Sequence, residues 1–164
     1  MAEAKSVTVS HTDGKRKHSM NRRLFLSGLL LTVLGILGGC APPPYTSLDN
    51  NQLKALVQQG VPLYDVRRPE EWRESGIVDG SRLLTFVDAR GRPLPDFFSR
   101  FTAAVGKNDP VILICRTGNR TDVLARHLME EMGYTRVYNV EHGISRWIRD
   151  KQPVARIEMR TTPP

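Results

Sequence analysis

The stretch that decides the fold is VILICRTGNR, residues 111–120, in which an apolar run ends at a cysteine and a short polar loop follows. A helical pattern with apolar positions at Leu124 and Leu128 comes next. A strand, a tight loop and a helix in this order direct backbone N–H groups towards one point. Cys115 lies at that point, where the helix N-terminus and nearby guanidinium groups favour a thiolate. The sequence therefore predicts a nucleophilic cysteine.

The residues after Cys115 are predicted to bind an anion. Arg116 and Arg120 bring positive charge to the loop, and Gly118 provides a backbone conformation that other residues rarely adopt. A cation at the start of a helix is unfavourable, so we expect an anion beside Arg120. Thr117 and Asn119 are expected to shape the loop and to help bind the anion.

The rest of the chain alternates between predicted strands and helices. Strands are predicted at 63–66, 81–86, 111–115 and 136–140, and helices at 49–59, 69–72, 95–105, 121–132 and 144–149. This alternation predicts an α/β domain with a largely parallel central sheet and helices on both faces. Ligands of such sheets bind at the carboxyl ends of the strands, where both Asp65 and Cys115 fall.

Three motifs, in order, resemble those of the rhodanese family. Residues 115–120 resemble the family's active-site loop, and Asp-Val-Arg at 65–67 with Glu-Glu-Trp at 70–72 resembles its first-strand signature. Gly143 and Trp147 resemble its closing Gly-x-x-x-Trp element. The resemblance implies a rhodanese-like domain at 48–150 and a sulfurtransferase that carries sulfane sulfur as a persulfide on Cys115. The donor would be an anion such as thiosulfate and the acceptor a thiol or a cyanide-like nucleophile, with no cofactor and no metal.

Asp65 and Arg67 are predicted to support the site. We expect Asp65 to be structural, tying the loop through Arg120 or through backbone amides, rather than to act as an acid or base. We expect Arg67 to form a surface ion pair with Glu70 or Glu71, which contributes little stability. No His, Cys and Asp spacing in the sequence indicates a metal site.

Other functions remain open. Some phosphatases and arsenate reductases share this fold type, and their loops resemble Cys-x5-Arg, whereas four residues separate Cys115 from Arg120 here. The smaller cradle is expected to suit a sulfane sulfur better than a tetrahedral phosphate. A non-catalytic persulfide carrier or protein-binding module would use the same loop residues, so steady turnover with thiosulfate distinguishes the enzyme from it.

Residues 20–40 resemble a bacterial lipoprotein signal peptide. Residues 1–19 are polar and expected to be disordered, and residues 20–40 carry Arg22 and Arg23, an apolar run and Leu-Gly-Gly-Cys at 37–40. The run is shorter than the roughly 20 residues of a membrane-spanning helix. The resemblance implies lipidation of Cys40, with an uncleaved anchor helix as the alternative. Met20 is an alternative start of translation, and the arginine pair also resembles a twin-arginine export signal.

Most of the net positive charge lies in residues 1–39, and the chain contains two cysteines. Residues 1–39 hold six of the 24 basic and two of the 17 acidic residues, so the remainder carries +3 of the net +7 and contains no basic run. We therefore expect no nucleic-acid partner. If Cys40 is lipidated, Cys115 is left unpaired in an oxidising compartment, which indicates a reactive thiol.

The positive charge before the apolar run predicts that the domain faces the periplasm or the cell exterior, anchored to a membrane by lipid. A Pro-rich spacer at 41–47 and a patternless tail at 151–164 are expected to flank the domain. An exported protein remains open as a further partner.

Overall fold

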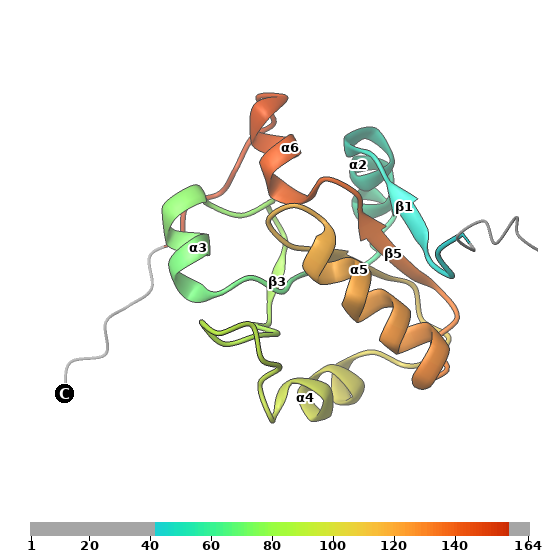
Figure 1. The fold of residues 1–164 in the computed structure, drawn as a ribbon. Coiled ribbons are helices and arrows are strands. Elements are labelled where there is room, and N and C mark those ends of the chain that lie inside the picture. The colour runs from blue at the N-terminus through green and yellow to red at the C-terminus, as the bar shows by residue number, and fades with distance from the viewer. Residues whose placement is uncertain (1–41, 158–164) are drawn as a thin grey trace, which may run out of the picture. The chain divides into compact units, whose positions relative to one another are not determined.

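The computed structural model describes residues 42–157, which form a five-stranded parallel sheet with helices on both faces (Figure 1). The strands are β1 Thr46–Leu48, β2 Leu63–Asp65, β3 Arg82–Leu83, β4 Val111–Ile114 and β5 Val137–Val140. Their order in the sheet is β1-β5-β4-β2-β3, and every neighbouring pair is parallel. The predicted signal peptide, including Cys40, lies outside the described residues.

The helices are α2 Asn50–Gln58, α3 Pro69–Ser75, α4 Phe97–Ala104, α5 Asn119–Arg126 and α6 Gly143–Arg149, and a π-helical turn, η1 His127–Glu131, continues α5. Within the described part of the chain, no helix has the length and hydrophobicity needed to cross a membrane. The predicted α/β class, with a parallel sheet between helices, is confirmed.

β4 lies at the centre of the sheet, and all four of its residues are buried. Successive side chains of a strand point to opposite faces, so an unbroken apolar run suits a strand covered on both sides. Ile112 and Ile114 pack into the core beneath α2 and α6, together with Leu53 and Trp147. Val111, Leu113 and Cys115 belong to the core beneath α4 and α5.

Local sequence signals explain most element boundaries. Asp49 caps α2 by accepting hydrogen bonds from the Asn51 and Gln52 N–H groups at 2.8 Å, and Gln52 accepts in return from the Asp49 N–H at 2.9 Å. An Asp followed by a Gln three residues later is the local sequence signal of such a reciprocal cap. Pro69 begins α3, where a missing N–H carries no penalty.

Three segments differ from their predictions because they depend on distant partners. The predicted strand at 81–86 is regular only at Arg82–Leu83, although Leu84 and Phe86 N–H groups still bond to the Asp65 and Val66 carbonyls. The predicted spacer at 41–47 enters the sheet, because Thr46 and Ser47 pair with β5. The predicted patternless tail at 151–164 includes Ala155, which pairs with Ile77 in an antiparallel bridge.

Candidate active site

Cys115 follows the last residue of β4, at the carboxyl edge of the sheet. Ile114 pairs with Asp65 across β2 and β4, so the ends of these two strands lie side by side. The Cys115 side chain is buried, with 1% of its surface exposed. The Gly118 N–H donates a hydrogen bond to Sγ at 3.2 Å. The strand therefore holds the sulfur at the start of the loop, facing a backbone donor.

Thr121 lies on the first turn of α5 and also reaches the sulfur. Its hydroxyl oxygen is 3.4 Å from Cys115 Sγ, 3.0 Å from the Gly118 carbonyl and 2.6 Å from Asn139 Oδ1. A hydroxyl has one proton, so it serves one of these acceptors at a time. Asn139 in turn donates to the Gly118 carbonyl at 3.3 Å. These buried polar groups form a hydrogen-bond network next to the sulfur.

The backbone at the start of α5 leaves donors available to an anion. The first helical hydrogen bond runs from the Asp122 N–H to the Gly118 carbonyl at 2.8 Å. The N–H groups of residues 119–121 precede it and therefore have no intrahelical acceptor. Gly118 caps the helix in a left-handed conformation, with φ +91°. Together with the Gly118 N–H at the sulfur, this arrangement favours negative charge at the loop.

Two glycines allow the loop to pack closely against its surroundings. A Cβ at Gly118 would lie 1.9 Å from the Glu141 carbonyl oxygen, and one at Gly143 would lie 2.4 Å from the Cys115 carbonyl oxygen. The N–H groups of Ile144 and Ser145, at the start of α6, donate to the carbonyls of Cys115 and Arg116 at 2.9 and 3.0 Å. The Gly-x-x-x-Trp element therefore packs against the active-site loop and fixes its backbone.

Arg120 pairs with a carboxylate of the protein itself. Arg120 Nη1 lies 3.1 Å from Glu71 Oε2, and the Arg68 backbone N–H donates to the same oxygen at 2.9 Å. Burial alone would raise the pKa of Glu71, but the hydrogen bonds from Arg120 and Arg68 outweigh it and hold this pKa below its ordinary value of 4.5. Arg120 therefore connects α5 to α3.

The predicted surface ion pair of Arg67 with Glu70 or Glu71 is wrong. Arg67 is 1% exposed and binds Asp65, which is fully buried, with Nη2–Oδ2 at 2.7 Å and Nε–Oδ1 at 2.9 Å. It also donates to the Gly76 carbonyl at 2.7 Å and to Ser75 Oγ at 2.6 Å. The surface pair is formed instead by Arg68, whose Nε lies 2.7 Å from Glu70 Oε1.

In the described residues, Asp65 bonds neither to Arg120 nor to a backbone amide of the Cys115 loop, and its amide partner lies in the turn after β2. The Arg67 N–H donates to Asp65 Oδ1 at 3.1 Å, while Arg120 pairs with Glu71. Asp65 and Arg67 thus hold the turn between β2 and α3, which positions Glu71. Their contribution to the site is support through α3, without contact with the sulfur.

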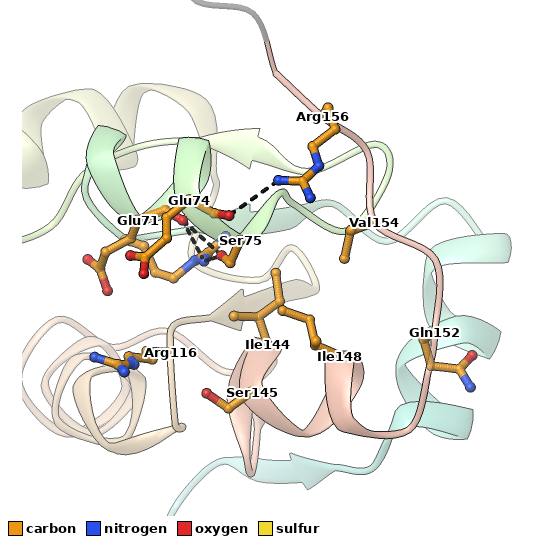
Figure 2. A pocket seen from close by; sticks show the side chains of 11 residues that line it. Glu71, Glu74, Ser75, Arg116, Ile144, Ser145, Ile148, Gln152, Val154 and Arg156 are labelled. Carbon is orange, nitrogen blue, oxygen red and sulfur yellow. Dashed lines mark hydrogen bonds between the residues drawn. The ribbon is translucent and has the colours of Figure 1, made fainter.

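The remaining loop residues are Arg116, Thr117 and Asn119, and the structure places Arg116 beside a cavity. Arg116, Thr117 and Asn119 are all exposed, and the hydrogen bonds to the sulfur come instead from Gly118 and Thr121. The cavity has a volume of about 550 Å³ and lies between the loop, α3, α6 and residues 152–156 (Figure 2). Within residues 42–157, no group of His, Cys, Asp and Glu side chains is arranged to hold a metal ion.

Sequence reasoning missed Thr121, Asn139 and Glu71 as members of the site. A signal for two of them was present: Asn139 interrupts the otherwise apolar strand β5, and Thr121 lies three residues before Leu124 on the buried face of α5. Buried polar groups need partners, and these two provide them for each other. No local signal indicates that Glu71 contacts Arg120, because 49 positions separate them.

The fold and this loop define a rhodanese-type domain. The family described as "Rhodanese-like domain" matches residues 49–150, and the chain belongs to this family. Rhodanese-like domain-containing protein 17 of Arabidopsis thaliana is 26% identical over 117 residues, which cover 68% of this chain and 74% of that protein. Thiosulfate sulfurtransferase GlpE of Tolumonas auensis is 27% identical over 104 residues, 63% of this chain and 88% of that enzyme.

Solved structures agree on the fold. The structure of reduced Bacillus anthracis CoADR-RHD is 27% identical with a TM-score of 0.54, and the match covers 68% of this chain and 18% of that longer protein. A polysulfide-sulfur transferase homodimer from Wolinella succinogenes has a TM-score of 0.57 at 20% identity, covering 84% of this chain and 93% of that one. The predicted family resemblance is confirmed for the domain.

Proposed function

We propose that the chain is a sulfurtransferase that carries sulfane sulfur from an anionic donor such as thiosulfate to a nucleophilic acceptor through a persulfide on Cys115. The position of Sγ carries this proposal. The sulfur lies at the start of the loop with the Gly118 N–H at 3.2 Å and the Thr121 hydroxyl at 3.4 Å. The relatives named as thiosulfate sulfurtransferases support the same chemistry.

In the loading step, the Cys115 thiolate attacks the outer sulfur of thiosulfate. The Sγ–S bond forms, the S–S bond of thiosulfate breaks, and sulfite leaves with the electron pair of that bond. The negative charge moves from Sγ to the terminal sulfur of the persulfide. Backbone donors already oriented at the start of α5 stabilise this anion without reorganisation. The exposed cation Arg116 helps attract an anionic donor.

The sequence favours survival of the persulfide. Cys115 and Cys40 are the two cysteines of the chain, so a lipidated Cys40 leaves no thiol to resolve the persulfide into an intramolecular disulfide. We further propose that lipidation of Cys40 anchors the domain to a membrane on its outer side, which rests on the lipobox-like residues 37–40 and the basic residues before the apolar run.

Mass spectrometry of the purified full-length chain tests the proposed reaction. After incubation with thiosulfate, the peptide containing Cys115 should gain the mass of one sulfur atom, and cyanide should remove it with release of thiocyanate. Cys115→Ser, which differs by one atom, should never gain the sulfur. Absence of loading with both thiosulfate and polysulfide would contradict the proposal. Loading without repeated turnover would identify a persulfide carrier instead of an enzyme.

A further inference from the structure

The cavity beside the active-site loop is much larger than the proposed donor requires. Its volume of about 550 Å³ lies within the roughly 300–1,000 Å³ typical of small-molecule sites. Thiosulfate has only five heavy atoms and would leave most of this space empty. Arg116, which adjoins Cys115 in the chain, forms part of the wall. The cavity therefore has room for a second reactant in addition to the donor.

Charges of both signs face each other across this cavity. Glu71 and Glu74 project from α3 on one wall, and Arg116 projects from the loop on the opposite wall (Figure 2). Arg120 partly neutralises Glu71. Neither Glu74 nor Arg116 forms an ion pair with any group in residues 42–157. A ligand that complements both walls carries a cationic group and an anionic group.

The base of the cavity is apolar. Ile144 and Ile148 of α6 line the cavity beside the charged side chains (Figure 2). Ile148 is 41% exposed and is one of two large hydrophobic side chains in the described residues that are exposed to this extent. An alkyl stem resting on Ile148 would remove this surface from water.

The segment that follows α6 completes the cavity on its far side. Val154 and Arg156 line it, and Arg156 Nη1 donates to the Glu74 carbonyl at 3.2 Å. Two backbone hydrogen bonds between Ile77 and Ala155, at 3.0 and 2.8 Å, fix the segment to the turn after α3. The wall is therefore part of the folded domain.

We propose that this cavity binds the sulfur acceptor, and that the acceptor is a thiol with both an ammonium and a carboxylate group, such as cysteine or a short peptide that contains it. This inference rests on the proposed sulfurtransferase function. The ammonium group would face Glu74, the carboxylate Arg116 and the stem Ile148, which leaves the thiol to point towards the loop.

The transfer step balances without a further reactant. The acceptor thiolate attacks the terminal sulfur of the Cys115 persulfide, and a new S–S bond forms on the acceptor. The bond between Sγ and the terminal sulfur breaks, and its electron pair leaves with Cys115 as a thiolate. The acceptor is released as its persulfide, and Cys115 is ready to accept the next sulfur.

A series of four acceptors tests the charge arrangement on the full-length chain. Cysteine carries both charges, cysteamine only the ammonium, mercaptopropionate only the carboxylate, and mercaptoethanol neither. The Michaelis constant for each acceptor is compared between wild type and Glu74→Gln, so the intrinsic reactivity of each thiol cancels. Removing one charge close to the ammonium should raise this constant about threefold to fivefold for cysteine and for cysteamine. For mercaptopropionate, the constant should stay the same or fall.

Glu131→Gln is the matched control, because Glu131 is exposed and does not line the cavity. It removes the same charge and should leave the Michaelis constants for all four acceptors unchanged. Equal changes for all four acceptors in Glu74→Gln, or the same pattern in Glu131→Gln, would overturn the proposal.

Two measurements separate failure of this inference from failure of the proposed function. Persulfide loading by thiosulfate is recorded by mass before any acceptor is added, and its absence would count against the proposed function alone. Binding of S-methylcysteine, which has the same charged groups without a free thiol, is then followed by NMR on the unloaded protein. Shifts should centre on the Ser145 and Ile148 amides and weaken in Glu74→Gln. Shifts elsewhere, or none at millimolar concentrations, would refute the assigned cavity.

Discussion

Asp65 and Arg67 show why charge alone is a poor guide to a residue's place in the fold. In the sequence, Arg67 precedes two acidic residues and has the pattern of an exposed ion pair. In the structure it is buried with Asp65, and backbone or side-chain oxygens of α3 and of the turn after it take up its remaining donors. A buried ion pair needs a hydrogen-bond partner for nearly every donor and acceptor, because an unpaired buried charge is costly.

We predict that breaking this pair destabilises the domain far more than breaking an exposed one. Asp65→Ala leaves the Arg67 guanidinium buried without its counter-ion and should lower the free energy of unfolding by about 3–5 kcal/mol. Arg92→Ala removes an exposed ion pair with Asp88, since the Arg92 side chain is 69% exposed. This change should lower the free energy of unfolding by less than about 1 kcal/mol. Urea unfolding measures both. Similar losses in the two variants would show that the buried network contributes little.

The groups that contact the Cys115 sulfur could be predicted only in part from the sequence. Cys115 and the loop glycine follow from a strand, a short loop and a helix, all of which are local features. The contact of Thr121 with Asn139 joins α5 to β5 across 18 positions, and it becomes visible only when these elements are packed. The prediction of anion-binding residues in the loop stays a prediction, because its test is a bound donor.

At the scale of elements, α3 connects the end of β2 to α5. Arg67 holds its C-terminal end through Ser75 and the Gly76 carbonyl, and Glu71 on its first turn binds Arg120 of α5. The orientation of Arg120 therefore depends on α3 as well as on its own helix. This connection titrates, because its anionic partner is a carboxylate.

We predict that the Glu71–Arg120 contact stabilises the fold only above acidic pH. The pKa of Glu71 is held below 4.5 in the folded protein, so its contribution is fully present above that value and is lost as pH falls through the folded pKa. Glu71→Gln should therefore lower the free energy of unfolding by about 1 kcal/mol at pH 7. The difference from wild type should shrink as the pH falls below 4.5.

Urea unfolding at several pH values measures this difference, with Glu131→Gln as the control. Glu131 is exposed and makes no ion pair with another described residue, so its replacement should change stability by less than about 0.5 kcal/mol at every pH. A Glu71→Gln deficit that stays constant or grows on acidification would contradict the prediction, since it would show that ionised Glu71 does not favour the folded state.

The elements predicted well are those whose signals are local. The cap of α2, the proline that begins α3 and the apolar run of β4 each act within a few residues. β1 and the segment at Ala155 were missed because short polar strands have no strong pattern of their own. Each is defined by a partner far along the chain, β5 for the one and Ile77 for the other. Long-range pairing of this kind has no signature in a single stretch of sequence.

At the scale of the whole molecule, the N-terminal side of the domain begins earlier than predicted. Tyr45 lies within the predicted spacer, but its hydroxyl donates to Asp122 on α5 and the Arg126 guanidinium lies 5.8 Å from its ring centre. Burial and the bond to Asp122 raise the pKa of Tyr45. Tyr45 is thus in tertiary contact with α5 five residues after Cys40, a distance of at most about 18 Å along an extended chain.

This short distance bears on the lipidation predicted for Cys40. If Cys40 carries the lipid, the domain sits directly against the membrane surface, and Cys40→Ala should abolish membrane attachment. Cys40 lies before the rhodanese-like domain, whose family match begins at residue 49, so the variant should fold normally and still load sulfur on Cys115. Partition of the protein between membrane and soluble fractions measures the effect. Cys115→Ser, the matched cysteine variant, should stay in the membrane fraction. A mature protein whose N-terminus lies upstream of Cys40 would refute lipidation and favour an anchor helix.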